Sequence, residues 1–169
     1  MALIDTGYLE LDELKSIQKL PDNERYAKGP VAVIECVQEI PCNPCEAACS
    51  FGAIHIGEPI TNLPTLDGEK CVGCGVCVSR CPGLAIVIVN KVYSETTATV
   101  SFPFEYYPTP EVGEIRGAMN RKGEILCQGK IVKVVNPISF DHTPVVTVEI
   151  PKEFADEVRT VERRSSHEQ

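Results

Sequence analysis

Cys71-Val-Gly-Cys74-Gly-Val-Cys77-Val-Ser-Arg-Cys81-Pro82 is the stretch around which the chain is organised. Its cysteines follow the spacing C-x2-C-x2-C-x3-C-P, which binds the iron of cubane iron–sulfur clusters. Gly73 and Gly75 lack a Cβ, so the loop can fold tightly and bring backbone N–H groups close to sulfur. Structural zinc, the main alternative, uses cysteine pairs separated by a longer spacer. The spacing therefore favours an iron–sulfur cluster.

A second cysteine motif precedes this one and repeats it. In Cys36-Val-Gln-Glu-Ile-Pro-Cys42-Asn-Pro-Cys45-Glu-Ala-Ala-Cys49, the last three cysteines align with Cys74, Cys77 and Cys81 at a constant offset of 32 residues. Such self-similarity indicates a duplicated half. Cys36 lies three residues before the position that the offset requires, which we interpret as an insertion in the first loop. The alternative is a three-iron cluster that does not use Cys36.

The repeat predicts two [4Fe-4S] clusters with crossed ligation. In proteins with two such clusters, the fourth cysteine of one motif ligates the cluster of the other. We therefore expect eight metal ligands, which are also the cofactor-binding residues. The first cluster is assigned Cys36, Cys42, Cys45 and Cys81. The second cluster is assigned Cys71, Cys74, Cys77 and Cys49.

Composition and missing motifs restrict the function. Sixteen basic and 24 acidic residues give a net charge of −8. This charge predicts a protein partner with a basic patch, and it argues against binding to nucleic acid or to an anionic membrane. No apolar run approaches the roughly 18 residues of a membrane span, and no signal peptide is visible, so we expect a cytoplasmic protein with reduced cysteines. We find no Walker loop, dinucleotide turn or Ser/His/Asp arrangement, so no catalytic residue is assigned.

Residues 31–90 resemble a two-cluster bacterial-type ferredoxin domain. The resemblance lies in Pro64-Thr-Leu-Asp-Gly-Glu-Lys-Cys71-Val-Gly-Cys74-Gly-Val-Cys77 as much as in the cysteines, and it covers about a third of the chain. It implies a ferredoxin-like fold that carries single electrons and performs no bond chemistry of its own.

The layout of the whole chain is similar to a further group of proteins. Gly29-Pro-Val-Ala-Val-Ile-Glu-Cys36, followed by a proline-rich cluster loop and a β segment, resembles ferredoxin-like iron–sulfur subunits of FAD-dependent amine and amino-acid dehydrogenases in anaerobic bacteria. This resemblance implies an FAD-containing dehydrogenase subunit as partner and a further electron acceptor downstream. A freely diffusing ferredoxin and a structural or regulatory iron–sulfur protein are the alternatives.

The sequence predicts an α+β chain in four parts. The N-terminal arm either covers the chain's own core or docks a partner. The two-cluster domain is expected to contain a strand at 31–34, a hairpin between 54–56 and 64–66, and a buried strand at 85–89 on the edge of the same small sheet. The four parts are the N-terminal arm (1–30), the two-cluster ferredoxin domain (31–90), a small antiparallel β domain (91–152), and a short helix with a tail (153–169).

Residues 91–152 show strand-like alternation. In 97–104, Ala98, Val100, Phe102 and Phe104 fall on one face, which predicts a half-buried strand. Further strands are expected at 112–119, 124–135 and 145–150, and a terminal helix is expected to begin at Pro151, with Phe154, Val158 and Val161 on its apolar stripe.

Several other side chains have chemistry of their own. Cys127 is interpreted as a small buried hydrophobe, not a ligand. His55 is expected to face solvent, because the cysteines already fill both cluster sites. Tyr106, Tyr107 and Phe102 are expected to pack into the core, and an exposed contact patch is the alternative.

Overall fold

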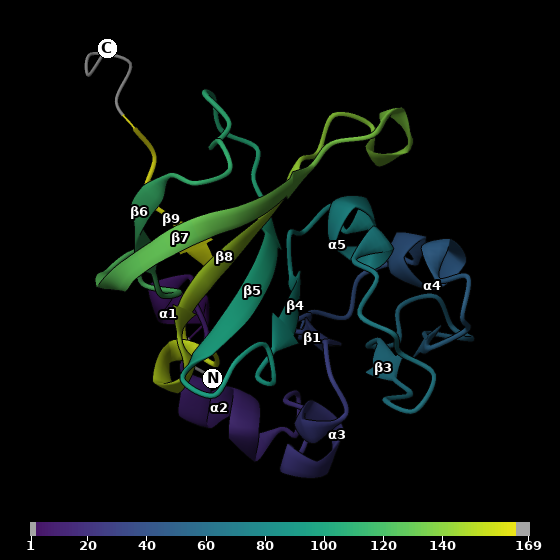
Figure 1. The fold of residues 1–169 in the computed structure, drawn as a ribbon. Helices are drawn as coiled ribbons and strands as arrows, with labels where there is room; N and C mark the ends of the chain where they lie inside the picture. The colour runs from purple at the N-terminus through teal and green to yellow at the C-terminus, as the bar shows by residue number, and fades with distance from the viewer. Residues whose placement is uncertain (1–2, 165–169) are drawn as a thin grey trace.

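A seven-stranded antiparallel sheet carries most of the chain (Figure 1). The structure is a computed structural model that describes residues 3–164. The strand order within these residues is β1-β4-β5-β8-β7-β6-β9. The strands are β1 (Val31–Ile34), β4 (Ile86–Asn90), β5 (Thr97–Pro103), β6 (Ile115–Met119), β7 (Ile125–Val135), β8 (Val145–Pro151) and β9 (Thr160–Val161).

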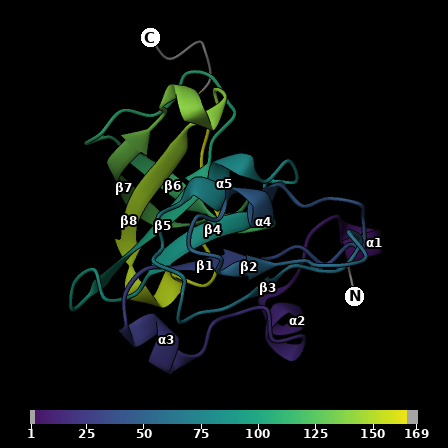
Figure 2. The ribbon, with the colours of Figure 1, turned by 90° about the vertical axis from the view of Figure 1, so that its right-hand side faces the viewer.

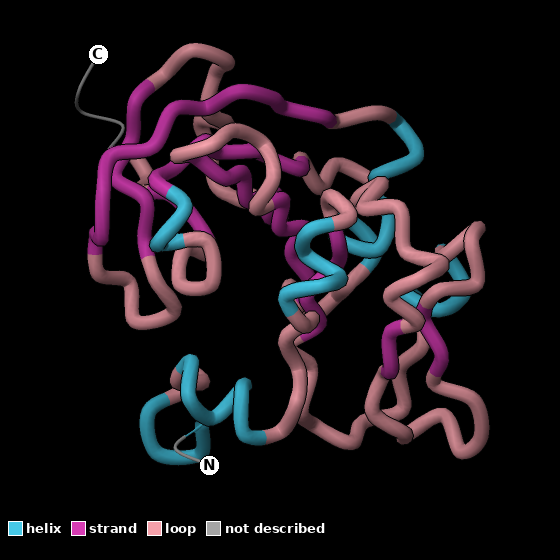
Figure 3. The backbone as a smooth tube through the Cα atoms, turned by 60° about the horizontal axis from the view of Figure 1, so that its bottom comes forward, coloured by secondary structure: helices cyan, strands magenta, loops and turns pink. Residues whose placement is uncertain are grey.

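The helices are short, and most of the cysteine-bearing segment is loop (Figure 3). The helices are α1 (Leu3–Thr6), α2 (Leu11–Ser16), α3 (Asn23–Ala27), α4 (Pro44–Ala48) and α5 (Val76–Arg80), with 3-10 turns η1 (Ile138–Phe140) and η2 (Lys152–Phe154). A separate two-stranded ribbon is formed by β2 (Ile54–His55) and β3 (Thr65–Leu66). Helices α4 and α5 lie side by side beyond the β1–β4 end of the sheet (Figures 1 and 2). The expected mixture of helices and strands is therefore present.

Strand β4 lies inside the large sheet, not at the edge of a small one. Val89 of β4 pairs with Val31 of β1 on one side and with Val100 of β5 on the other. The edge position expected for this strand is wrong, because β5 pairs with the side of β4 opposite β1 and satisfies backbone groups that an edge strand leaves unpaired. The expected hairpin is present, with Ile54 opposite Leu66. The boundary proposed between residues 90 and 91 thus falls between two paired strands.

The side chains of β1 and β4 alternate between two apolar cores. Val33 and Val89 belong to the core on the face that β5 and β8 complete. Ile34 and Ile88 belong to a second core that also contains Cys45 and Cys77. Because side chains alternate between the faces of a strand, one face of β1 and β4 forms an apolar surface against which the cysteine-bearing segment packs.

Strand β5 and the hairpin that follows agree closely with expectation. Ala98, Val100, Phe102 and Phe104 are all buried, so the predicted inward face is confirmed. The strands expected at 112–119, 124–135 and 145–150 are present as β6, β7 and β8. The turn between β6 and β7 places Gly123 at a φ of +82°, a left-handed conformation that glycine adopts readily.

The end of the described chain departs from the predicted helix. A single 3-10 turn, η2, is followed by β9, whose Val161 pairs with Ala118 of β6. The Arg159 N–H donates to the Met119 carbonyl over 2.8 Å, so this segment is captured by the sheet edge before a helix can extend. Val158 and Val161 are buried as the apolar stripe required. Residues 165–169 of the expected tail lie outside the described residues.

Two aromatic side chains depart from the sequence expectation. Tyr106 and Tyr107 are 55% and 90% exposed, so the expected packing into the core is wrong for both. Both follow the end of β5, where the chain leaves the sheet. Tyr106 makes an edge contact to Phe104, with ring centroids 5.6 Å apart, and the Arg163 guanidinium lies over its ring at 5.4 Å.

The N-terminal helices cover the core of their own chain. Leu14 of α2 and Tyr26 of α3 are buried, and Tyr26 packs with Val31 and Val89. The covering role expected for this arm is therefore confirmed, and its docking role stays a prediction. None of the helices within residues 3–164 is both long and apolar enough to cross a membrane.

Candidate iron–sulfur site

Eight cysteines line two separate, mostly apolar cavities. Cavity I is lined by Cys36, Cys42, Cys45 and Cys81, together with Ile34, Ile56 and Ile86. Cavity II is lined by Cys49, Cys71, Cys74 and Cys77, together with Phe51, Ile54 and Ile88. Each cavity thus takes three cysteines from one motif and one from the other. The structure brings together the two sets that crossed ligation requires.

Helices α4 and α5 produce the crossing. Cys45 lies in the first turn of α4 and Cys77 in the first turn of α5, and both are buried. Cys49 and Cys81 are the C-caps of the same helices. A helix of five residues advances about 7 Å, so its two ends face different cavities. The three residues between the last two cysteines of each motif therefore form the helical turn that separates these two cysteines.

The widened first loop still brings Cys36 to cavity I. Cys36 follows β1 directly, and Gln38 and Ile40 of the inserted loop also line the cavity. The inserted residues therefore extend the wall of the cavity and do not carry Cys36 away from it. This position favours a four-cysteine site over a three-iron cluster without Cys36.

Burial and the charge of neighbouring cysteines raise the pKa of a buried thiol in each cavity. Burial raises the pKa of Cys77 to about 12, and the nearby Cys71, Cys74 and Cys49 add to the effect. Burial likewise raises the pKa of Cys45 to about 11, with Cys81 and Cys42 contributing. A bound metal centre deprotonates its thiols outright, so cluster binding would release protons from these cavities.

Three backbone N–H groups point at cysteine sulfur. The Ala53 N–H donates to Cys49 Sγ over 3.2 Å, and the Ala85 N–H donates to Cys81 Sγ over 3.4 Å. The Ala32 N–H of β1 donates to Cys71 Sγ over 3.4 Å. Such bonds stabilise a thiolate and raise the potential of a cluster. Ala53 and Ala85 occupy equivalent positions of the repeat, a signal of this role that the sequence analysis did not use.

The ninth cysteine lies apart from both cavities. Cys127 is in β7, partly buried against the core of the sheet, where burial and the nearby Glu153 raise its pKa. His55 is exposed in β2, as expected. Within residues 3–164, no three His, Cys, Asp or Glu side chains gather closely enough to hold a single metal ion. Four soft thiols around an apolar hollow fit an iron–sulfur cluster.

Two charged side chains beside the cavities were missed by the sequence analysis. Glu35 precedes Cys36 and accepts hydrogen bonds from Arg121 and Arg159. Arg25 of α3 donates to the Cys71 carbonyl over 2.6 Å. Neither belongs to a cysteine motif, and both depend on contacts between distant segments, so no local pattern indicated them.

A family model matches the cysteine-bearing segment of this chain. Residues 35–85 match the model of the 4Fe-4S dicluster domain. The Na(+)-translocating ferredoxin:NAD(+) oxidoreductase complex of Acetobacterium woodii has a subunit that is 49% identical over 47 residues, which is 28% of this chain and 14% of that protein. An uncharacterized ferredoxin of Methanocaldococcus jannaschii is 34% identical over 68 residues, 40% of each chain.

The relatives are not all redox proteins by name. Translation initiation factor rli1 of Schizosaccharomyces pombe is 31% identical over 106 residues, 53% of this chain and 18% of that protein. The chain thus spans between 14% and 40% of the length of these three relatives. No solved structure matches it. Residues 35–85, which the family model matches, contain all eight cysteines of the two cavities, and the chain therefore contains a 4Fe-4S dicluster domain of the ferredoxin type.

Proposed function

We propose that this chain transfers single electrons through two [4Fe-4S] clusters, as a subunit of a larger oxidoreductase. The observation that carries the proposal is the pair of cavities, each lined by four cysteines from both motifs. Cys36, Cys42, Cys45 and Cys81 are the proposed ligands in cavity I, and Cys49, Cys71, Cys74 and Cys77 are those in cavity II. Because α4 and α5 lie between the cavities and pack together, the two clusters are neighbours.

The clusters supply the one-electron chemistry, and the chain prepares their surroundings. Ile34 and Ile86 exclude water from cavity I, and Ile54 and Ile88 do the same in cavity II. Exclusion of water and the N–H donors to sulfur together set the reduction potentials. The protein's task is therefore to hold and tune the clusters.

Cavity II contains the one exposed cysteine of the eight proposed ligands, so we assign it the exchange of electrons with a partner. Cys74 is the exposed member of the eight cysteines. The half-exposed side chains of Phe51 and Val72 flank it, and both line cavity II. The segments 50–53 and 72–76 contain no charged residue. A partner can approach this rim without desolvating charges, which makes a close contact inexpensive.

For the partner, we propose an FAD-containing dehydrogenase that oxidises a C–N bond of an amine or amino acid. Flavin takes a hydride from its substrate and gives electrons up singly, which is the step that two clusters can accept. The resemblance of the chain's layout to such subunits supports this assignment. The oxidoreductase-complex relative of Acetobacterium woodii supports membership of a complex in general. A further acceptor takes the electrons onward, and we place the complex in the cytoplasm of an anaerobe.

Anaerobic metal analysis tests the cofactor content. We expect about eight iron and eight acid-labile sulfide per chain after reconstitution. Cys127→Ser should retain all of them, because Cys127 lies outside both cavities, whereas Cys45→Ser should lose or convert the cluster of cavity I. Stoichiometric zinc with negligible sulfide would contradict the proposal.

Native gel filtration with mass identification tests the partner. Co-elution with an FAD protein supports the subunit, and elution of the chain alone at its own mass points to a diffusing ferredoxin. A structural or regulatory role is the second candidate, and the match to a translation initiation factor favours it. In that case the clusters would assemble normally, yet no flavoprotein would reduce them.

A further inference from the structure

Arg25 is a buried cation that meets only neutral acceptors. Its side chain is in a residue only 8% exposed. Nη2 donates to the carbonyls of Cys71, over 2.6 Å, and Pro30, over 2.9 Å. Nε donates to the Gly68 carbonyl over 2.6 Å, and Nη1 to the Gly29 carbonyl over 3.3 Å. The guanidinium thus joins α3, the loop before β1 and the loop that leads into Cys71.

Local sequence places the guanidinium in this position. The Asp22 carboxylate caps α3 by accepting from the Arg25 N–H over 2.7 Å, which fixes the start of the helix. Gly68 leaves room for the side chain, because a Cβ there would lie 3.2 Å from Arg25 Cδ. Asp22 at the start of α3 and Gly68 in the loop before Cys71 therefore both help to place the Arg25 side chain beside this loop.

The absence of a carboxylate distinguishes Arg25 from the other buried arginines. Arg116 pairs with Glu114 at 2.6 Å, and Arg121 and Arg159 both pair with Glu35. No ion pair involves Arg25 within residues 3–164. A buried charge is costly unless an opposite charge lies nearby. Four thiolates around a cubane make a negatively charged group. Arg25 donates to the backbone carbonyl of Cys71, whose thiol is one of the proposed ligands.

The same contacts reach the second ligand of cavity II. Pro30, whose carbonyl Arg25 holds, packs directly on Gly73, where a Cβ would come within 2.6 Å of Pro30 Cβ. Gly73 lies between Cys71 and Cys74, so movement of Pro30 displaces the loop between two ligands. Cavity I has no corresponding contact with Arg25, whose acceptors all belong to residues 29–30 and 68–71.

We propose that Arg25 is a positioning residue of cavity II that holds the Cys71 loop and raises the reduction potential of the cluster there. A reduced cluster carries one more negative charge, so a fixed cation beside it stabilises the reduced state. The inference rests on the proposed cluster binding and deepens it, because it separates the electrical behaviour of the two cavities. Electrons would then come to rest in the cluster beside the exposed Cys74.

The test compares three variants of the full chain with wild type, reconstituted anaerobically. Arg25→Gln removes the charge, and Arg25→Lys keeps the charge but has fewer donors. Lys28→Gln is the matched control, because Lys28 lies one turn further on in an exposed pair with Glu69. Circular dichroism reports folding, metal analysis reports cluster content, and redox titration with paramagnetic resonance reports each potential. Wild type lacking two clusters would refute the proposed function itself.

With two clusters in wild type, the outcomes decide the inference. We expect Arg25→Gln to shift the reduction potential of the cavity II cluster to more negative values and to leave that of the cavity I cluster unchanged. Arg25→Lys should show a smaller shift. Selective loss of the cavity II cluster from a folded variant equally supports the positioning role. Unchanged potentials, or equal shifts of both clusters, overturn it. Should Arg25→Gln not fold, Arg25→Lys decides: a selective effect on cavity II supports the inference, and an equal or absent effect refutes it.

Discussion

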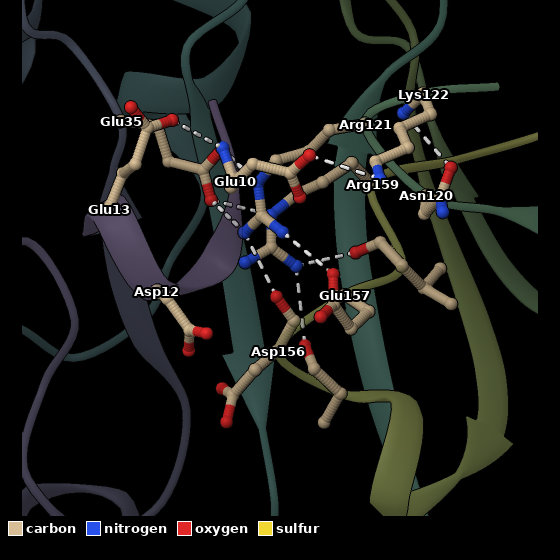
Figure 4. A network of polar contacts seen from close by, with 12 residues as sticks. Glu10, Asp12, Glu13, Glu35, Asn120, Arg121, Lys122, Asp156, Glu157 and Arg159 are labelled. Atoms are coloured by element: carbon tan, nitrogen blue, oxygen red, sulfur yellow. Dashed lines mark hydrogen bonds and ion pairs between the residues drawn. The ribbon is translucent and has the colours of Figure 1, made fainter. Parts of the chain in front are cut away.

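Arg159 Nε lies 2.7 Å from Glu35 Oε1, a contact between residues 124 positions apart in the chain (Figure 4). Arg121, in the turn between β6 and β7, donates to the same carboxylate through Nη2 over 2.6 Å and Nε over 2.9 Å. Glu35 sits between β1 and Cys36, so the C-terminal strands fasten the first cysteine of cavity I. Burial opposes the charge, but the bonds from Arg121 and the charge of Arg159 prevail and keep the pKa of Glu35 low.

Glu35→Gln removes the negative charge that two buried arginines share. We expect a loss of about 3 kcal/mol in the free energy of unfolding, because uncompensated buried charge remains. Chemical denaturation of the reconstituted protein measures it. Asp12→Asn is the control, since the Asp12–Lys15 pair is exposed and such pairs contribute about 0–1 kcal/mol. Equal losses in both variants would contradict a structural role for the buried cluster of charges.

Crossed ligation is tested by four single substitutions. Cys49→Ser should alter the same paramagnetic signal as Cys74→Ser, since both cysteines line cavity II. Cys81→Ser should alter the other signal, together with Cys42→Ser, since both line cavity I. If Cys49→Ser instead grouped with Cys42→Ser, each motif would fill its own site and the arrangement around α4 and α5 would be wrong.

Gly73→Ala should damage cavity II selectively. Gly73 has a φ of +66°, and an added Cβ would lie 2.6 Å from Pro30 Cβ, so both backbone strain and a clash oppose the change. We expect loss of stability of about 1–3 kcal/mol and a weakened cavity II signal. Gly83→Ala is the matched control in the other loop, because nothing lies within 4 Å of its Cβ position. Similar cluster content in the two variants would show that the close contact with Pro30 is dispensable.

Cys127 should react slowly with alkylating reagents, and its reaction rate should not depend on whether the clusters are bound. Burial and Glu153 raise the pKa of its thiol, so little reactive thiolate forms near pH 8. In the reconstituted protein, iodoacetamide followed by mass analysis should find Cys127 modified more slowly than glutathione. Removal of iron by a chelator should then expose Cys74 to rapid modification while Cys127 keeps its rate. Rapid labelling of Cys74 in the loaded protein would argue against its ligation.

The sequence predicted the site better than its surroundings. Fixed spacing within each motif follows from local geometry, so the grouping of Cys49 with Cys71 could be anticipated from the repeat alone. Strands were equally visible where alternation was strict, as at Ala98 and Val100. What local pattern could not reveal was which strand lies beside which. The apolar run at 86–90 gave no sign that β5 would be its second neighbour.

The partners of buried arginines were the least predictable feature. Arg25, Arg121 and Arg159 look like ordinary surface cations in the sequence, because no motif includes them. Only the fold shows that they bury their guanidinium groups against backbone carbonyls or Glu35. The terminal helix was wrong for a related reason: the apolar spacing of Val158 and Val161 was real, but an open edge of β6 offered better hydrogen bonds.

The double pairing of β4 limits how the cysteine-bearing segment can be used in protein engineering. A portable ferredoxin cut from residues 31–90 would leave β4 without β5, so that its free N–H and C=O groups and the buried Val87 and Val89 would face water. Unprotected apolar edges of this kind recruit strands from other molecules and lead to aggregation. A transplantable version needs a charged or proline-blocked edge at β4 before it is fused to a new enzyme. In this chain, strand β5 supplies that protection.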